Sequence, residues 1–349
     1  MATSDYITFA RARATQADTL AAAIDRIADD VRELQEEEVL SGPGPIFVGI
    51  GASLASACAP VWTLRSRGIH SWRLGAGEHP LPFPRSPHPI IGVSQSGKST
   101  ETLAVLGSVD HRMRLAVVNS SPSPVSEMSG RFLSLGNIPD SYASSIGYTA
   151  TITGLGMIAD VWDGGAIDDG WIALPDHFRA TEAAVTTRAA ELAEAFRGVG
   201  AADFVGAGPS VGSAEAGALL FREIARIHSS GMGTRQYLHG SMESAGEGAH
   251  MLFGDDRERG VALTLAEAGH RVILVSSHDV PEAENLQTVT LPALPPSQRA
   301  ILEALVLQIL VAQVADQNGV DVEEFVFHNS DTKVEVGALG AGGLESDPS

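Results

Sequence analysis

A serine-rich turn is the first part of this sequence that could carry chemistry. It places three hydroxyls within six residues, at Ser94, Ser96 and Ser99, directly after an apolar run. This pattern predicts the junction of a buried strand and a helix, where free backbone N–H groups and the helix dipole favour an anion. We therefore predict a phosphate site, with Ser53 in the matching turn of an earlier strand–helix unit. The alternative is that these serines act only as helix caps.

The same turn also fits a nucleotide-binding pattern. Residues 92–99 match G-x-x-x-x-G-K-[ST], in which Lys98 would contact phosphates. Against this interpretation, only a short apolar stretch precedes Gly92, and no apolar run ending in Asp supplies a second magnesium ligand. We favour a phosphate site without a nucleotide and keep the NTPase as an alternative. Lys98 then either reaches the phosphate or is solvated.

Glu223 is a candidate general base. On a helix it would share a face with Leu219 and Leu220. Apolar neighbours raise the pKa of a carboxyl group, which suits proton transfer near neutral pH. The alternative is an ion pair with Arg222 or Arg226.

The basic residues are strongly biased toward arginine. The chain has 21 Arg and two Lys, Lys98 and Lys333. An arginine codon bias explains the trend as a whole. However, a lysine can lose its proton and attack a carbonyl, whereas an arginine stays protonated. Both lysines are therefore candidates for chemistry that arginine cannot do.

Charge and composition exclude several classes of protein. The 349 residues carry 43 Asp and Glu against 23 Lys and Arg, for a net charge of −20. Nucleic acids and anionic membranes require basic patches, so neither partner is expected. The single cysteine, Cys58, excludes a disulfide framework and a cysteine-based zinc site, and we expect it in the core. No signal peptide or uninterrupted apolar span of about 20 residues is evident, so a cytoplasmic protein is expected.

The elements that position these residues follow an alternating pattern. Apolar runs at residues 45–51, 89–93 and 114–118 are each followed by a helical pattern. This alternation predicts an α/β fold with doubly wound parallel sheets. Residues 47–57 match residues 204–214 at seven of eleven positions, at an offset of 157. Two copies of one α/β domain are therefore expected.

The predicted organisation has five parts. They are an N-terminal helical arm (1–44), a first domain (45–175), a linker helix (176–199), a second domain with a C-terminal loop (200–335) and a disordered tail (336–349).

Four separated motifs, in this order, resemble the tandem sugar-isomerase (SIS) family, in particular the isomerase half of glucosamine-6-phosphate synthase. They are the turn at Ser53, the serine-rich turn, E-I-x-x-I-H beginning at Glu223 with the following His239-Gly240, and the terminal loop around Lys333. The resemblance implies two tandem SIS domains of flavodoxin-like topology.

The resemblance also implies roles for the residues. The sugar phosphate would be held by Ser53, Ser94, Gln95, Ser96 and Ser99. Glu223 would move a proton between C1 and C2, and Lys333 would form a Schiff base with an open ketose. His239 would open the sugar ring from a neighbouring subunit, which implies a homodimer. Glu243 is a weaker candidate, and His228 matches the motif but is expected in the core. No metal or other cofactor is implied.

Two departures from the family limit the reaction. Leu220 stands where the synthase has a lysine, and no glutaminase domain with a nucleophilic cysteine is expected. The resulting hypothesis is a phosphosugar enzyme that catalyses aldose–ketose isomerisation, or deamination or deglycation of an amino-sugar 6-phosphate. The alternative is a phosphosugar sensor that binds without reacting.

Overall fold

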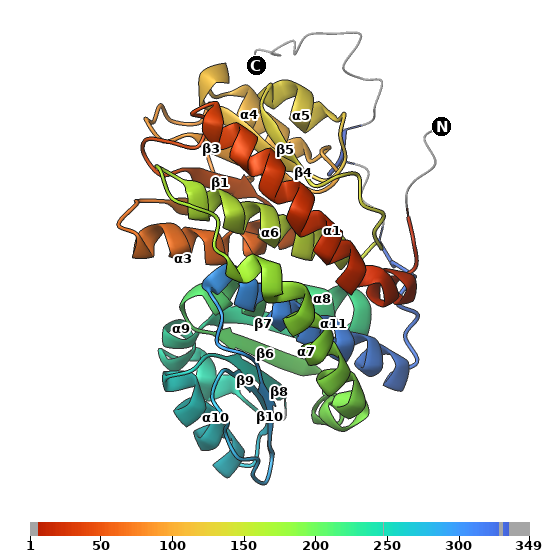
Figure 1. Cartoon of the computed structure of the whole chain (residues 1–349). Helices are drawn as coiled ribbons and strands as arrows, with labels where there is room; N and C mark the ends of the chain where they lie inside the picture. Colours follow the sequence, from red (N-terminus) through yellow and green to blue (C-terminus); the bar gives the residue numbers. More distant parts are fainter. Residues whose placement is uncertain (1–5, 247, 328–330, 335–349) are drawn as a thin grey trace.

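The computed structural model describes residues 6–246, 248–327 and 331–334 and contains two five-stranded parallel sheets (Figure 1). The first has the order β2-β1-β3-β4-β5 and is formed by β1 (Ile46–Gly49), β2 (Trp72–Gly75), β3 (Ile90–Ser94), β4 (Arg114–Val118) and β5 (Phe132–Ser134). The second has the order β10-β9-β8-β6-β7 and is formed by β6 (Ala201–Gly206), β7 (His228–Gly233), β8 (Ala249–Phe253), β9 (Arg271–Ser276) and β10 (Leu286–Thr290). Every pair of neighbouring strands is parallel. The prediction of two doubly wound α/β sheets is confirmed.

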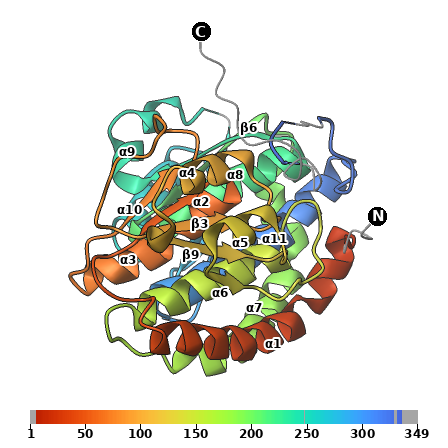
Figure 2. The ribbon, with the colours of Figure 1, turned by 90° about the horizontal axis from the view of Figure 1, so that it is seen from above.

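Helices cover both faces of each sheet. The outer face of the first sheet packs against α4 (Thr100–Gly107) and α5 (Pro124–Ser129), and that of the second against α9 (Thr234–Leu238) and α10 (Arg257–Glu267). The layer between the sheets contains α2 (Ala52–Ser56), α3 (Cys58–Ser66), α6 (Ile146–Val161), α8 (Val211–Leu220) and α11 (Pro296–Gln317). The long helices α1 (Phe9–Glu36) and α7 (Gly170–Ala193) pack beside α6 and α11 (Figures 1 and 2).

The sequence explains the helical arm directly. The Thr8 side chain caps α1 by accepting a hydrogen bond from the Arg11 N–H at 3.2 Å. An apolar stripe that recurs every three or four residues is buried along this helix: Leu20, Ile24, Ile27, Val31 and Leu34. The linker helix begins at Gly170, six residues before the predicted start. The predicted disordered tail lies outside the described residues.

One large core joins the two halves. Strand residues alternate between faces, so Phe47 points to the inner layer while Val48 packs under α4. The inner faces of both sheets, together with α6 and α11, form a single apolar cluster. Among the described residues, α11 is the one helix long and apolar enough to cross a membrane. About 78% of its apolar window is buried inside the protein, which accounts for its composition.

Candidate active site

The carboxyl ends of β1 and β3 bring the predicted phosphate ligands together. The two strands pair in register, with Val48 opposite Gly92, and the chain leaves them in opposite directions across the sheet. Such a switch point in the strand order is where open α/β sheets bind ligands. Ser53 lies in the first turn of α2 here, and the serine-rich turn lies beside it between β3 and α4.

The serine-rich turn has a fixed backbone. Gly97 has a φ of +63°, and a Cβ at this position would lie 2.0 Å from the Ser123 Oγ. Only glycine therefore fits the turn. Ser94 is buried at the end of β3, whereas Ser96 and Ser99 are partly exposed. The Ser99 hydroxyl accepts a hydrogen bond from the Thr102 hydroxyl at 3.2 Å and donates one to the Glu101 carboxylate at 3.2 Å, so its role as a phosphate ligand stays a prediction.

Gln95 is held by a residue that sequence reasoning missed. Its side-chain amide donates to the Asp140 carboxylate at 2.8 Å. The same carboxylate accepts the N–H groups of Ser145, Ile146 and Gly147, so it also caps α6. Gln95 thus has an internal partner, and its role as a phosphate ligand stays a prediction. Asp140 lies six residues before the start of α6, outside the usual capping position, so no signal for this cap was visible in the sequence.

The structure argues against the nucleotide-loop interpretation. Gly92, the first glycine of that pattern, lies inside β3, where it pairs with Val48 and Ala116. A Cβ there would lie 2.7 Å from the Leu106 side chain, so this glycine serves strand–helix packing. A phosphate-wrapping loop would need this residue outside the sheet.

Glu223 lies on a widened helical turn. Helix α8 continues into the π-helical turn Phe221–Ala225, which ends at Arg226 with a φ of +55°. Such turns are rare and occur frequently at functional sites. Phe221 and Ile224 anchor the turn in the core, and Glu223 is left partly buried beside the first domain.

Burial raises the pKa of Glu223 to about 7. The carboxylate lines a cavity of about 40 Å³ together with Ala52, Leu220 and Gln308, among others. The alternative ion pair is not observed, because Arg222 donates to the Ser229 carbonyl at 2.6 Å and Arg226 pairs with Glu324. A carboxyl group of this pKa exchanges its proton readily near neutral pH.

Packing of α8 against α2 brings Glu223 to the amino end of α2, where Ala52 lines the same cavity. A Cβ on Gly51 would lie 3.6 Å from the Leu219 side chain, and one on Gly212 would lie 2.4 Å from the Ala55 carbonyl oxygen. The helices therefore run antiparallel, with the carboxyl end of α8 at the amino end of α2. The first domain supplies hydroxyl groups and the second supplies a carboxylate.

The C-terminal segment returns to the same turn. Lys333 forms an antiparallel bridge with Ser99, and the Val334 N–H donates to the Lys98 carbonyl at 3.0 Å. The Thr100 hydroxyl donates to the Asp331 carbonyl at 2.9 Å. These contacts hold the exposed Lys333 next to the serine-rich turn, 234 residues away in the sequence.

His239, His228 and Glu243 lie outside the Glu223 cavity. His239 is exposed just after α9 and is not among the described residues that line the Glu223 cavity. Glu243 is exposed in a short helical turn. The expectation that His228 is a core residue is wrong, because it is exposed at the start of the edge strand β7.

Three residues around Glu223 were missed by sequence reasoning. Ser144 and Tyr148 come from the amino-terminal region of α6, and Gln308 comes from the middle of α11. The Gln308 Oε1 is buried and has no hydrogen-bond partner among the described residues. A glutamine within the otherwise apolar run at residues 305–311 was the one visible signal. Across the described residues, no three His, Cys, Asp or Glu side chains are grouped so that they could hold a metal ion.

Solved structures confirm the fold. The C-terminal domain of glucosamine-fructose-6-phosphate aminotransferase from Francisella tularensis aligns with a TM-score of 0.76 at 19% identity, covering 90% of this chain and 97% of that chain. Tagatose-6-phosphate ketose/aldose isomerase from Escherichia coli aligns with a TM-score of 0.76 at 13% identity, covering 92% of this chain and 97% of that chain. Glucosamine-6-phosphate deaminase from Thermotoga maritima aligns with a TM-score of 0.67 at 16% identity, covering 88% and 97%.

Sequence comparisons add no closer relative. No protein-family model matches the chain, and no curated protein matches it. The predicted resemblance to the SIS fold is thus confirmed by structure.

Proposed function

We propose that this chain is an enzyme of sugar 6-phosphates that interconverts an aldose and a ketose. The observation that carries the proposal is Glu223, a partly buried carboxyl group of pKa about 7 in a cavity that is also lined by Ala52, the neighbour of Ser53. The structural neighbours named above act on sugar phosphates, which supports the substrate class.

In the proposed reaction, Ser53, Ser94, Ser96 and Ser99 bind the phosphate and so fix the open sugar chain. Ionised Glu223 removes the proton from C2 of the aldose, and the electron pair forms an enediol with C1. Glu223 then returns the proton to C1, while a proton passes from the C2 oxygen to the C1 oxygen. The product is the isomeric ketose, and no atom is gained or lost.

Two residues would complete the site. We propose that His239 reaches the site of a partner subunit in a cytoplasmic homodimer and opens the sugar ring there. The Lys333 amine, once neutral, would attack a ketose C2 carbonyl and release water to form an imine. The position of Lys333 beside Ser99 favours a second candidate reaction, deamination or deglycation of an amino-sugar 6-phosphate.

The test is turnover of fructose 6-phosphate, glucosamine 6-phosphate and fructosamine 6-phosphate. We expect Glu223→Gln to lower kcat at least a hundredfold, because a general base contributes about 10²–10⁴-fold. Glu267→Gln, a change at an exposed glutamate at the end of α10, is the matched control. Unchanged turnover in Glu223→Gln would contradict the proposal.

The sensor alternative rests on Leu220, whose apolar side chain lines the Glu223 cavity. It predicts tight binding of a phosphosugar without turnover by the unmodified chain. Borohydride trapping separates the two functions, since an adduct on Lys333 that is absent in Lys333→Arg requires imine chemistry. Binding with neither turnover nor adduct would favour the sensor.

A further inference from the structure

A second and larger cavity lies at the carboxyl ends of β6 and β7. Its volume is about 640 Å³, and it is distinct from the Glu223 cavity. The turn at Gly206 and Gly208 lines it together with the adjoining helix α3, which contributes Trp62 and Arg65. Asp256 and Arg257, which follow β8, also line it, so the cavity lies at the switch point between β6 and β8, as the serine-rich turn does between β1 and β3 in the first sheet.

Helix α3 forms one side of the cavity because it packs against the turn Gly208–Ser210 that precedes α8. The offset of 157 places Ser66 at the position of Glu223 and Arg65 at that of Arg222. The second cavity therefore has no carboxylate at the position of the general base.

The second cavity is also basic. Four arginines line it, Arg65, Arg73, Arg235 and Arg257, against two carboxylates, Asp256 and Glu258. Arg73 is paired with Glu215 at 2.7 Å. Arg235 and Arg257 are exposed, and neither makes an ion pair with any of the described residues. Two free guanidinium groups in a chain with a net charge of −20 favour an anionic ligand.

Thr234 gives an independent indication of a ligand. It lines the cavity with 4% of its surface exposed, and its buried hydroxyl has no hydrogen-bond partner among the described residues. Leaving a buried hydroxyl unpaired costs about 1–3 kcal/mol. A ligand oxygen in the cavity would satisfy it.

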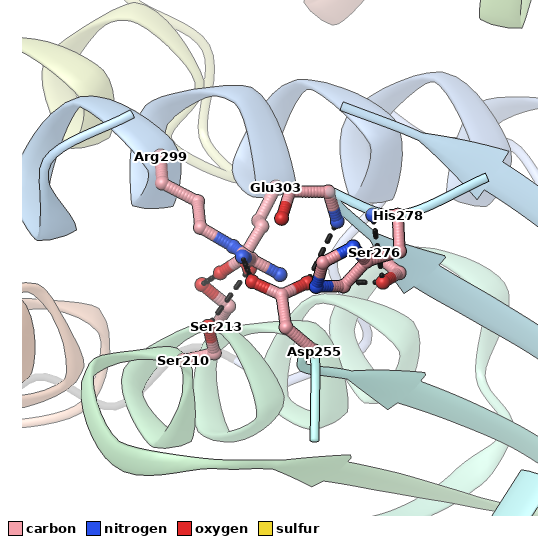
Figure 3. A network of polar contacts seen from close by, with 8 residues as sticks. Ser210, Ser213, Asp255, Ser276, His278, Arg299 and Glu303 are labelled. Carbon is pink, nitrogen blue, oxygen red and sulfur yellow. Dashed lines mark hydrogen bonds and ion pairs between the residues drawn. The ribbon is translucent and has the colours of Figure 1, made fainter. Parts of the chain in front are cut away.

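The serines of the second domain are not available for this ligand. Ser210, which occupies the position of Ser53, donates to Glu303 at 2.8 Å, and Ser213 donates to the same carboxylate at 2.6 Å (Figure 3). Arg299 completes the network by binding Glu303 and Asp255. The Glu303 carboxylate therefore occupies the hydroxyl groups of Ser210 and Ser213. In the second cavity, recognition of an anion is left to the arginines.

We propose that this cavity binds a phosphorylated sugar without reacting and acts as a regulatory site. Arg235 and Arg257 bind the phosphate, Thr234 bonds a sugar hydroxyl, and the Trp62 ring, 46% exposed, packs against the sugar face. The site does not depend on catalysis by Glu223.

The test is calorimetric titration of the whole chain with fructose 6-phosphate and with inorganic phosphate. We expect two equivalents of fructose 6-phosphate per chain. Arg235→Ala/Arg257→Ala should lose one, and Ser94→Ala/Ser96→Ala should lose the other. Each lost contact to a charged group weakens binding about tenfold or more. Arg112→Ala, which removes an exposed arginine elsewhere, should retain both.

The outcomes separate this inference from the proposed function. The second site would be overturned if the unmodified chain bound one equivalent of fructose 6-phosphate and only the serine variant lost it. It would also be overturned if the arginine variant still bound two equivalents. A single equivalent lost only in the arginine variant would support the second site and contradict the proposed phosphate turn. If the second site bound inorganic phosphate as tightly as fructose 6-phosphate, the proposal that it recognises the sugar would be overturned.

Thr234→Val tests the site with a variant that should remain folded. Because the threonine hydroxyl is unpaired, the valine variant should keep or raise the melting temperature of the unliganded protein. Its affinity for fructose 6-phosphate at the second site should fall about threefold to tenfold. Unchanged affinity would remove Thr234 from the site.

Discussion

Replacement of Glu223 by glutamine should stabilise the folded protein at alkaline pH. Burial raises the pKa of this carboxyl group from 4.5 to about 7. A tenfold change in a proton-binding constant corresponds to about 1.4 kcal/mol, so ionised Glu223 opposes folding by about 3 kcal/mol. Glutamine carries no charge at any pH and resembles the protonated acid in shape.

The sign of the pH dependence follows from the direction of the shift. Between pH 4.5 and about 7 the folded protein binds a proton that the unfolded chain has released, so stability falls as pH rises through this window. The gain from Glu223→Gln should therefore be at most about 1 kcal/mol at pH 5 and about 3 kcal/mol at pH 8.5. For a chain of this length, 3 kcal/mol corresponds to about 4 °C in melting temperature.

The assay is thermal unfolding of the unmodified chain and of Glu223→Gln at pH 5 and pH 8.5. Glu243→Gln is the control, because this glutamate is exposed and its replacement should leave the melting temperature unchanged at both values. A variant that is no more stable than the unmodified chain at pH 8.5 would refute the assignment of a strained, buried carboxylate. The measurement is independent of catalysis and of the identity of the substrate.

Further predictions concern the rate and three structural contacts. If Glu223 is the general base, kcat/KM should rise about tenfold per pH unit below pH 7 and level off above it, as a rate profile would show. Glu303→Ala should destabilise the protein by about 3–5 kcal/mol in denaturant titrations, because it leaves Arg299 and two hydroxyl groups unpaired in the core. Asp140→Ala should cost about 2 kcal/mol by the same method, since α6 loses its cap. Gly97→Ala should cost about 1–3 kcal/mol and weaken phosphosugar binding in calorimetry, because φ is positive there and Ser123 blocks the new methyl group.

The sequence predicted most of the central strands, because buried parallel strands read as apolar runs, but it missed the edge strands β2, β5, β7 and β10. It did not predict that the halves share one core. Helices α6 and α11 are apolar on nearly all sides, so their pattern has no periodicity that identifies the surfaces they contact. Helix α7 begins at Gly170, before the predicted start, and contains Pro175, a residue that usually marks the end of a helix rather than its interior.

The site was predictable where local sequence determines local geometry. The serine turn needs only a strand end, a glycine and a helix start, all visible in the chain. The internal partner of Gln95 was not predictable, since Asp140 lies 45 residues away and meets it only through tertiary packing. The π-helical turn at Glu223 was also missed, because the sequence pattern there continues an ordinary helix.

The shared core has a consequence for synthesis on the ribosome. Helix α11, which packs against the inner layers of both halves, is completed only at Gln317, near the end of the described chain. Until it emerges, the nascent chain holds two nearly complete sheets whose facing apolar surfaces lack a common partner. Such an intermediate exposes aggregation-prone surface. We therefore expect a fragment that ends between Thr290 and Pro296 to bind chaperones and precipitate, although it contains all ten described strands.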